Sequence, residues 1–315
     1  MRPSGMAAAG LGYGRRAAGR RAIALVTAVL VLAGCGDGGA GPVPPAVMTP
    51  GPLPSSVVLE VEVAQARTDR VARVVELQVR NTGPVDVTVT RARLTSDVVA
   101  GVSAAGREVP AGRMRRLRVP LGAAVCAGGT DVDPRARVEL DVSTADGAGG
   151  TVVVTPTDET DDLRRIHGED CAAAAVGAGL RVALADDLAV REVDGVPVAD
   201  VTLVLEAVPG GPHVRLVSVR ATTLLRPWGG TGQWAVDVGS AALPPDGRLV
   251  LPTVPARCDL HAIAEDKRGT VLGVQAVVDG AEQPLFHVAA SDALRGALHA
   301  YVLAACGLPD DARTG

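Results

Sequence analysis

The stretch Leu77-Gln78-Val79-Arg80-Asn81-Thr82-Gly83-Pro84 decides the fold, because it joins an alternating run to a turn and recurs once along the chain. Apolar and polar residues alternate in its first half, which is the two-residue period of a half-buried β-strand. Its second half, Asn-Thr-Gly-Pro, is a strong turn signal. The corresponding stretch is Leu205–Pro212, which also ends in glycine and proline. The repeat indicates two copies of one β-domain.

The repeat continues to the end of each copy. Arg116–Pro120 corresponds to Arg248–Pro252, and a cysteine follows at the same distance in both copies. Each copy then ends in a short helical pattern, expected at Thr160–His167 and from Asp292 to Ala305. Many short strands separated by regular turns are typical of an antiparallel sandwich. We predict a mainly β chain with two tandem immunoglobulin-like β-sandwiches, each with a short C-terminal helix and one disulfide.

The cysteines support this division. The chain has five, and four of them fall at equivalent places in the two copies. We predict the bridges Cys126–Cys171 and Cys258–Cys306, because each pair is internal to one copy. An even set of cysteines suits an oxidising compartment. Free thiols or a structural metal site are less favoured, since the close cysteine pairs typical of zinc are absent from the sequence.

The N-terminal region predicts export. Arginines precede the apolar run Ala22–Ala33, which is too short to span a bilayer and suits a signal peptide. Leu32-Ala33-Gly34-Cys35 follows and resembles the lipobox of bacterial lipoproteins. That resemblance implies a diacylglycerylated Cys35 as the new N-terminus, and a lipid anchor on the extracytoplasmic face of the cell membrane. The alternative is an ordinary secreted protein with a cysteine at this place.

These signals divide the chain into segments. Residues 36–56 are rich in proline and glycine and cannot form a core, so we expect a disordered tether there. The expected division is a signal peptide at 1–34, the lipidated cysteine and tether at 35–56, a first sandwich at 57–171, a short linker at 172–179, a second sandwich at 180–307 and a disordered tail at 308–315.

The charge balance excludes one class of function. The formal net charge is −4, and removal of residues 1–34 would take away arginines but no acidic residue. A nucleic-acid binder normally carries a basic stripe or domain, so we expect no nucleic-acid partner. Lys267 is the only lysine, a bias typical of a GC-rich genome. The stretches Val254–His261 and Ala264–Thr270 are similar to secreted actinobacterial proteins, a resemblance that implies no particular activity.

The sequence contains no familiar catalytic motif. It has no GxSxG elbow, phosphate-binding loop or HExxH pair, so we expect no enzyme and no cofactor. A metal pair of His287 with His299 is an alternative, but isolated histidines more commonly serve structural roles. The acidic run Asp158–Asp162 is an alternative calcium site, but carboxylates also stabilise the start of a helix. We therefore predict no metal.

Two surface features are candidate binding sites. Trp228-Gly229-Gly230-Thr231-Gly232-Gln233-Trp234 places two tryptophans around a glycine-rich turn. If this loop is exposed, it could bind a sugar or a protein partner through Trp228, Gly229, Gly230 and Trp234. The favoured interpretation is that both indoles are buried in the core. The second feature is four arginines on one predicted strand, which would contact anionic lipid or a wall polymer, or would protect a sheet edge from aggregation. They are Arg113, Arg115, Arg116 and Arg118.

The combined features predict a membrane-anchored envelope lipoprotein with a non-enzymatic binding, structural or accessory role. Its expected partners are the membrane, through Cys35, and an envelope protein or cell-wall polymer. The alternative is a solute-binding or enzymatic lipoprotein of an envelope transport or assembly system. A solute-binding protein would normally show α/β alternation and an aromatic-lined cleft, which the sequence lacks.

Overall fold

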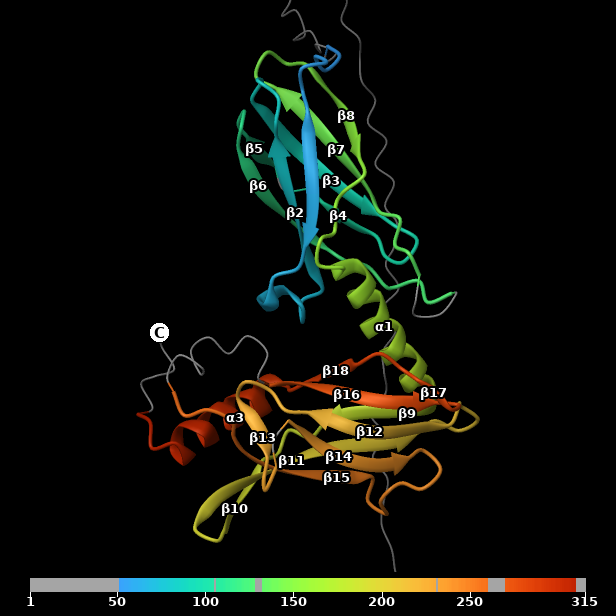
Figure 1. Cartoon of the computed structure of the whole chain (residues 1–315), viewed down its shortest axis with the longest axis vertical. Coiled ribbons are helices and arrows are strands. Elements are labelled where there is room, and N and C mark those ends of the chain that lie inside the picture. The colour runs from blue at the N-terminus through green and yellow to red at the C-terminus, as the bar shows by residue number, and fades with distance from the viewer. Residues whose placement is uncertain (1–50, 105, 128–131, 231, 260–269, 310–315) are drawn as a thin grey trace, which may run out of the picture. The chain divides into compact units, whose positions relative to one another are not determined.

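The computed structural model describes residues 51–104, 106–127, 132–230, 232–259 and 270–309. Their strands form antiparallel sheets that pair into two successive β-sandwiches (Figure 1). One disulfide and one α-helix accompany each sandwich. The predicted fold class, with tandem immunoglobulin-like sandwiches, is therefore confirmed.

The first sandwich consists of a three-stranded and a five-stranded sheet. The smaller sheet has the order β1-β2-β6, and the larger has the order β4-β3-β7-β8, with β5 also paired to β3. A short 3-10 helix, η1, spans Arg67–Asp69. The strands are β1 (Leu59–Ala64), β2 (Val74–Asn81), β3 (Val87–Thr95), β4 (Gly101–Ser103), β5 (Arg107–Val109), β6 (Met114–Pro120), β7 (Arg137–Thr144) and β8 (Gly149–Val154).

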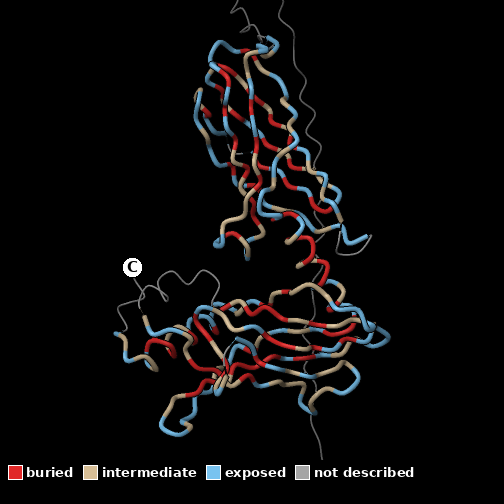
Figure 2. Tube along the Cα trace, in the orientation of Figure 1, coloured by how far each residue is buried: buried red, intermediate tan, exposed pale blue. Residues whose placement is uncertain are grey.

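Alternation along the strands builds the first core. The register of β1 against β2 places Val61 opposite Val79 and Val63 opposite Leu77, so apolar side chains pair on one face. Leu77 itself is completely buried. Figure 2 shows the same alternation of buried and exposed residues along these strands.

The turn after β2 has a clear physical basis. Asn81 is buried, and its side-chain amide donates to the carbonyls of Val85 at 2.7 Å and Val109 at 3.0 Å. A Cβ on Gly83 would lie 2.2 Å from the carbonyl oxygen of Ser56, so only glycine fits there. Gly211, the aligned glycine of the second copy, would meet Ala178 O at the same 2.2 Å. The repeat therefore preserves a close backbone approach.

The second sandwich consists of two five-stranded sheets. One has the order β10-β11-β15-β13 with β9 also on β11, and the other has the order β14-β12-β16-β17 with β18 also on β16. The strands of the first are β9 (Leu180–Leu184), β10 (Ala189–Val193), β11 (Val196–Ala207), β13 (Leu225–Pro227) and β15 (Arg248–Pro255). Those of the second are β12 (Val214–Arg220), β14 (Gln233–Gly239), β16 (Val271–Val278), β17 (Ala281–Glu282) and β18 (Phe286–Ala289).

Helix α1 corrects part of the sequence interpretation. It spans Asp162–Gly179, so it continues well beyond the expected Thr160–His167 and through residues 172–179, which we expected to be a linker. Four consecutive alanines in that stretch, at 172–175, have the highest helix propensity of any residue. The helix contributes Leu163 and Ile166 to the first core and Ala172 and Val176 to the second. Both cores therefore depend on one helix.

Helix α3 spans Asp292–Ala305 and begins as the sequence predicts. The hydroxyl of Ser291 accepts a hydrogen bond from the Leu294 amide at 3.1 Å, which is an N-cap. Its buried face includes Leu298 and Tyr301. In the described part of the chain, neither helix combines the length and apolarity needed to cross a membrane.

Candidate functional site at the Cys126–Cys171 bridge

The start of α1 is fixed by a carboxylate network. The carboxylate of Asp158 accepts hydrogen bonds from the amides of Asp162 at 2.8 Å and Leu163 at 2.9 Å. Asp162 in turn accepts from Arg165 Nη2 at 2.6 Å and from the hydroxyl of Thr160 at 2.8 Å. These bonds engage the acidic run as a helix cap, the structural role that the sequence favoured over a calcium site.

Asp162 is ionised by this environment. Burial alone would raise the pKa of its carboxyl, but the hydrogen bonds from Arg165, Thr160 and the Gln65 amide hold that pKa below its usual value. The Gln65 amide donates to Asp162 Oδ2 at 2.8 Å, which links α1 to the segment that follows β1. The network therefore positions the helix against the first sandwich.

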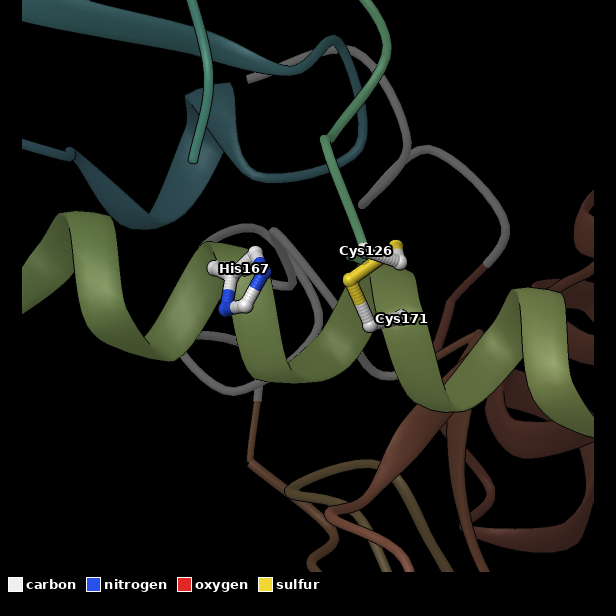
Figure 3. Close-up of side chains that lie close together, drawn as sticks. All are labelled: Cys126, His167 and Cys171. Carbon is white, nitrogen blue, oxygen red and sulfur yellow. A yellow bond between two sulfur atoms is a disulfide. The ribbon is translucent and has the colours of Figure 1, made fainter. Parts of the chain in front are cut away.

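One turn further along α1, a histidine lies beside the first disulfide. Both bridges predicted from the repeat are present, with Cα atoms 5.4 Å apart for Cys126–Cys171 and 5.3 Å apart for Cys258–Cys306. His167 and Cys171 are four residues apart on the helix, so they share one face. A ring nitrogen of His167 and both sulfur atoms of the first bridge all lie within 4.8 Å of one another (Figure 3).

The three side chains differ sharply in exposure. His167 is 0 % exposed and Cys171 is 5 % exposed, whereas Cys126 lies on the surface. The bridge therefore joins an exposed residue to a buried residue of α1. Among the described residues this is the single group of three potential metal ligands, and it includes neither His287 nor His299.

One ring nitrogen of His167 is hydrogen-bonded and the other is not. Nε2 lies 3.0 Å from the carbonyl oxygen of Val125, and a carbonyl only accepts, so Nε2 carries a hydrogen. Nδ1 is buried and has no hydrogen-bond partner in the described part of the chain. A buried polar atom without a partner is costly and unusual. The imidazole beside the disulfide therefore has one unpartnered nitrogen.

The charged side chains that follow on α1 pair with one another. Glu169 lies 3.1 Å from Arg165 Nη1 and 3.5 Å from His287 Nδ1. Burial alone would raise the pKa of Glu169, but its bonds to His287 and Arg165 lower it below the usual value. Asp170 forms an ion pair with Arg73. His287 is thus engaged by a carboxylate, which agrees with a structural role for this histidine.

The two tryptophans of the candidate binding loop have different environments. Trp234 lies on β14, is 6 % exposed and belongs to the second core, and its Nε1 donates to the carbonyl of Pro252 at 2.9 Å. Burial in the core, the interpretation that the sequence favoured, therefore holds for Trp234, and its alternative role as an exposed binding residue is excluded. Trp228 is half-buried at the turn with Gly229 and Gly230.

The arginine-rich strand is a sheet edge. β6 pairs with β2 in the three-stranded sheet and forms its outer strand. Arg118 forms an ion pair with Asp69, and Arg116 lies 3.5 Å from Glu76. Arg113 and Arg115 are also exposed. Charge on an edge strand discourages pairing with another chain, which is the role that the sequence favoured, and contact with an anionic surface stays a prediction.

The remaining site prediction, lipidation of Cys35, lies outside the described residues. Sequence reasoning also treated the histidines as scattered and so missed His167. The spacing of four residues between His167 and Cys171 was visible, but the helix was expected to end at His167, so their shared face was not predicted. Only the closure of the bridge brings Cys126 to the same place.

No protein-family model matches this sequence, and no curated protein matches it. Several solved structures are similar in fold. The CsuC–CsuE chaperone–tip adhesion subunit complex of the archaic chaperone-usher Csu pili of Acinetobacter baumannii is 10 % identical, with 76 % of this chain and 100 % of that chain covered and a TM-score of 0.17. Such a low score describes a general likeness between chains and carries no information on function.

Two further structures illustrate the range of proteins with this likeness. Red sea bream transglutaminase is 14 % identical, with 76 % of this chain but 32 % of that chain covered and a TM-score of 0.20. The B domain of a biofilm associated protein is 7 % identical, with 76 % of this chain and 87 % of that chain covered and a TM-score of 0.17.

Proposed function

We propose that this chain is a lipid-anchored protein of the cell envelope whose two sandwiches have a non-enzymatic binding or accessory role. The observation that carries the proposal is the assignment of the cysteines. The chain has five, and four of them pair with one another in the two bridges. The fifth is Cys35, which ends the lipobox-like stretch Leu32–Cys35. A thiol at that place is the acceptor that lipidation requires.

The two disulfides support a location outside the cytoplasmic membrane. Disulfides form and persist in oxidising surroundings such as the periplasm or the cell surface. A chain that carries two of them is suited to the outer side of a membrane. The expected tether is shorter than 36–56, because Gly51 pairs with Ala148 and Leu53 packs against the first core. The Pro/Gly-rich residues 36–50 that follow Cys35 would then separate the sandwiches from the membrane. A flexible segment of that length would have a reach of roughly 20 Å.

The architecture argues against the alternative, a solute-binding lipoprotein. A solute-binding lipoprotein is expected to contain parallel sheets with helices on both faces. The strand pairs of the described residues are antiparallel, and the two helices are attached to β-sandwiches. This arrangement favours a role in which loops and sheet faces contact another macromolecule of the envelope.

Lipidation is testable in cells with an alkyne-labelled fatty acid. We expect the wild-type chain to incorporate the label and to sediment with membranes, and Cys35→Ala to lose both properties. Asp37→Ala is the matched control, because it lies two residues beyond the lipobox and should behave as wild type. Globomycin, an inhibitor of the lipoprotein signal peptidase, should lead to accumulation of a precursor. Equal labelling and sedimentation of Cys35→Ala and wild type would refute the anchor.

The binding role is tested by crosslinking in the native envelope. A crosslinker applied to intact cells should capture an envelope protein or wall fragment with the wild-type chain. Purified protein should show no turnover of envelope polymers, and reproducible turnover would refute the non-enzymatic assignment.

A further inference from the structure

We propose that Cys126, Cys171 and His167 form a zinc-binding site when the Cys126–Cys171 bridge is reduced. In the oxidised chain the two sulfurs are bonded to each other and neither is a thiolate. Reduction would convert them into two thiols beside an imidazole. Two thiolates and one imidazole are a ligand set that Zn²⁺ uses widely. The redox state of the bridge would therefore determine whether the two cysteines can bind a metal ion.

The geometry requires little movement. The three ligand atoms already lie within 4.8 Å of one another. Two thiolates on one tetrahedral zinc, each at about 2.3 Å from the ion, lie about 3.8 Å apart. His167 and Cys171 are held on successive turns of α1, so their spacing is fixed by the helix. Only Cys126, on a surface loop, has to adjust.

The surroundings of His167 suit a metal ligand. The ring is completely buried, and Nδ1 has no partner in the described part of the chain. Ligation through Nδ1 would keep the hydrogen bond from Nε2 to Val125 O, the kind of backbone contact that usually orients a metal-binding imidazole. Ligation through Nε2 would cost that one bond. Ligation through Nδ1 is therefore the mode that keeps the existing hydrogen bond.

The difference in exposure sets the order of the reduction. A thiolate of a dithiol reductant would attack the sulfur of Cys126, the exposed residue of the pair, and the bond to Cys171 would break with Cys171 leaving as a thiolate. The second thiolate of the reductant then attacks its own sulfur in the mixed disulfide and releases Cys126. Two electrons and two protons pass from the dithiol, which becomes a disulfide. Zn²⁺ then displaces the two thiol protons. Because Cys126 is an exposed residue, a water molecule could occupy the fourth coordination position of the zinc ion.

The second bridge gives an internal comparison. Cys258–Cys306 closes a loop of similar size but does not belong to a group of three potential ligands in the described residues. Among the described residues, reduction of that bridge would give two thiols with no imidazole grouped beside them. The proposal therefore distinguishes two disulfides of the same chain by one histidine.

The experiment uses the full chain with Cys35→Ser, which removes the only other thiol. Two further variants isolate the bridges: Cys258→Ala with Cys306→Ala keeps the first, and Cys126→Ser with Cys171→Ser keeps the second. Each is reduced with a phosphine, desalted under argon and titrated with Co²⁺ as a spectroscopic substitute for Zn²⁺. We expect the variant that keeps the first bridge to bind one Co²⁺, with thiolate-to-cobalt charge transfer and tetrahedral d–d bands that Zn²⁺ abolishes. The same protein before reduction should show neither.

His167→Asn in the variant that keeps the first bridge tests the imidazole. We expect at least about tenfold weaker binding of Co²⁺, because loss of even an outer-shell partner of a ligand costs 10–100-fold. If reduction abolishes the circular dichroism signal of the fold, Zn²⁺ should restore that signal in the protein that retains His167 but not in His167→Asn. The proposal is wrong if the variant with the first bridge binds no more Co²⁺ than the variant with the second. It is equally wrong if His167→Asn leaves affinity and metal-dependent refolding unchanged.

Discussion

The indole Nε1 of Trp234 donates a hydrogen bond to the carbonyl oxygen of Pro252 at 2.9 Å, across the two sheets of the second sandwich. Trp234 lies on β14 and Pro252 on β15, which belong to different sheets. The contact therefore satisfies a buried donor and joins the two layers. It also explains why a tryptophan after a glycine-rich turn is a core residue.

Replacement of Trp234 should therefore cost far more stability than replacement of Trp228. We expect Trp234→Ala to lower the free energy of unfolding by about 3–5 kcal/mol, because it leaves a large cavity. Trp228→Ala, at a half-buried position, should cost less than half of that. Urea denaturation measures both, and fluorescence of Trp228→Ala should show the blue-shifted emission of a buried indole. Equal losses in the two variants would contradict this assignment.

Two glycines near the end of α1 should respond in opposite directions to alanine. A Cβ on Gly177 meets nothing within 4 Å, so Gly177→Ala should stabilise the helix by about 0.5–1 kcal/mol. A Cβ on Gly179 would lie 2.2 Å from the carbonyl oxygen of Pro212, so Gly179→Ala should destabilise the protein by about 1–3 kcal/mol or more. Thermal unfolding of the pair checks the result. A loss of stability in Gly177→Ala would show that the helix end is packed differently.

The stability of the helix start should depend on pH through Asp162. Its pKa is lower in the folded protein than the ordinary value of 3.8, so its ionised form stabilises the fold above that value. This contribution is lost as the pH falls through the folded-state pKa. Asp162→Asn should cost about 1–3 kcal/mol at neutral pH and should flatten the acid limb of the stability curve.

Asp161→Asn is the matched control for Asp162. The Asp161 side chain is 80 % exposed and lies 4.0 Å from Arg164. It has a φ of 52°, a conformation that asparagine tolerates well. We expect a change below about 0.5 kcal/mol and an unaltered acid limb. An effect as large as that of Asp162→Asn would mean that net charge, and not the buried network, controls the acid response.

The two bridges should contribute similarly to stability. They close loops of 45 and 48 residues, and the chain-entropy model gives roughly 4 kcal/mol for either. Cys126→Ala with Cys171→Ala, and Cys258→Ala with Cys306→Ala, should therefore shift the urea midpoint by comparable amounts. A difference above about 2 kcal/mol would show that contacts around one bridge, such as those of His167, outweigh loop closure.

Much of this fold follows from local patterns. The alternation in Leu77–Arg80, the turn at Gly83 and the equivalent spacing of cysteines are short-range signals, and they predict strands, repeat and bridges. The N-cap at Ser291 is equally local. Each of these features depends on residues that are near in sequence or that a repeat makes equivalent.

The remaining features depend on contacts distant in sequence. Residues 172–179 were expected to be a linker, and they are helical because Ala172 and Val176 pack into the second core, while Ala173 and Ala174 are exposed. The sequence favoured burial of the indoles, but it could not show that the carbonyl of Pro252 lies opposite Trp234 and accepts its hydrogen bond. His167 gains its position beside Cys126 only when a distant loop is closed by the bridge.

The Cys126–Cys171 bridge also has a mechanical consequence. A chain pulled from its two ends transmits tension through covalent bonds, and the disulfide offers a direct route between residues that are 45 positions apart. The strands β7 and β8 and the first half of α1 lie inside that loop and are bypassed by the load. A fully stretched segment of this length would extend by about 150 Å. When the oxidised protein is stretched, its contour length should therefore be shorter than that of the reduced protein by about this amount. Reduction of the bridge would allow the segment between the two cysteines to extend as well.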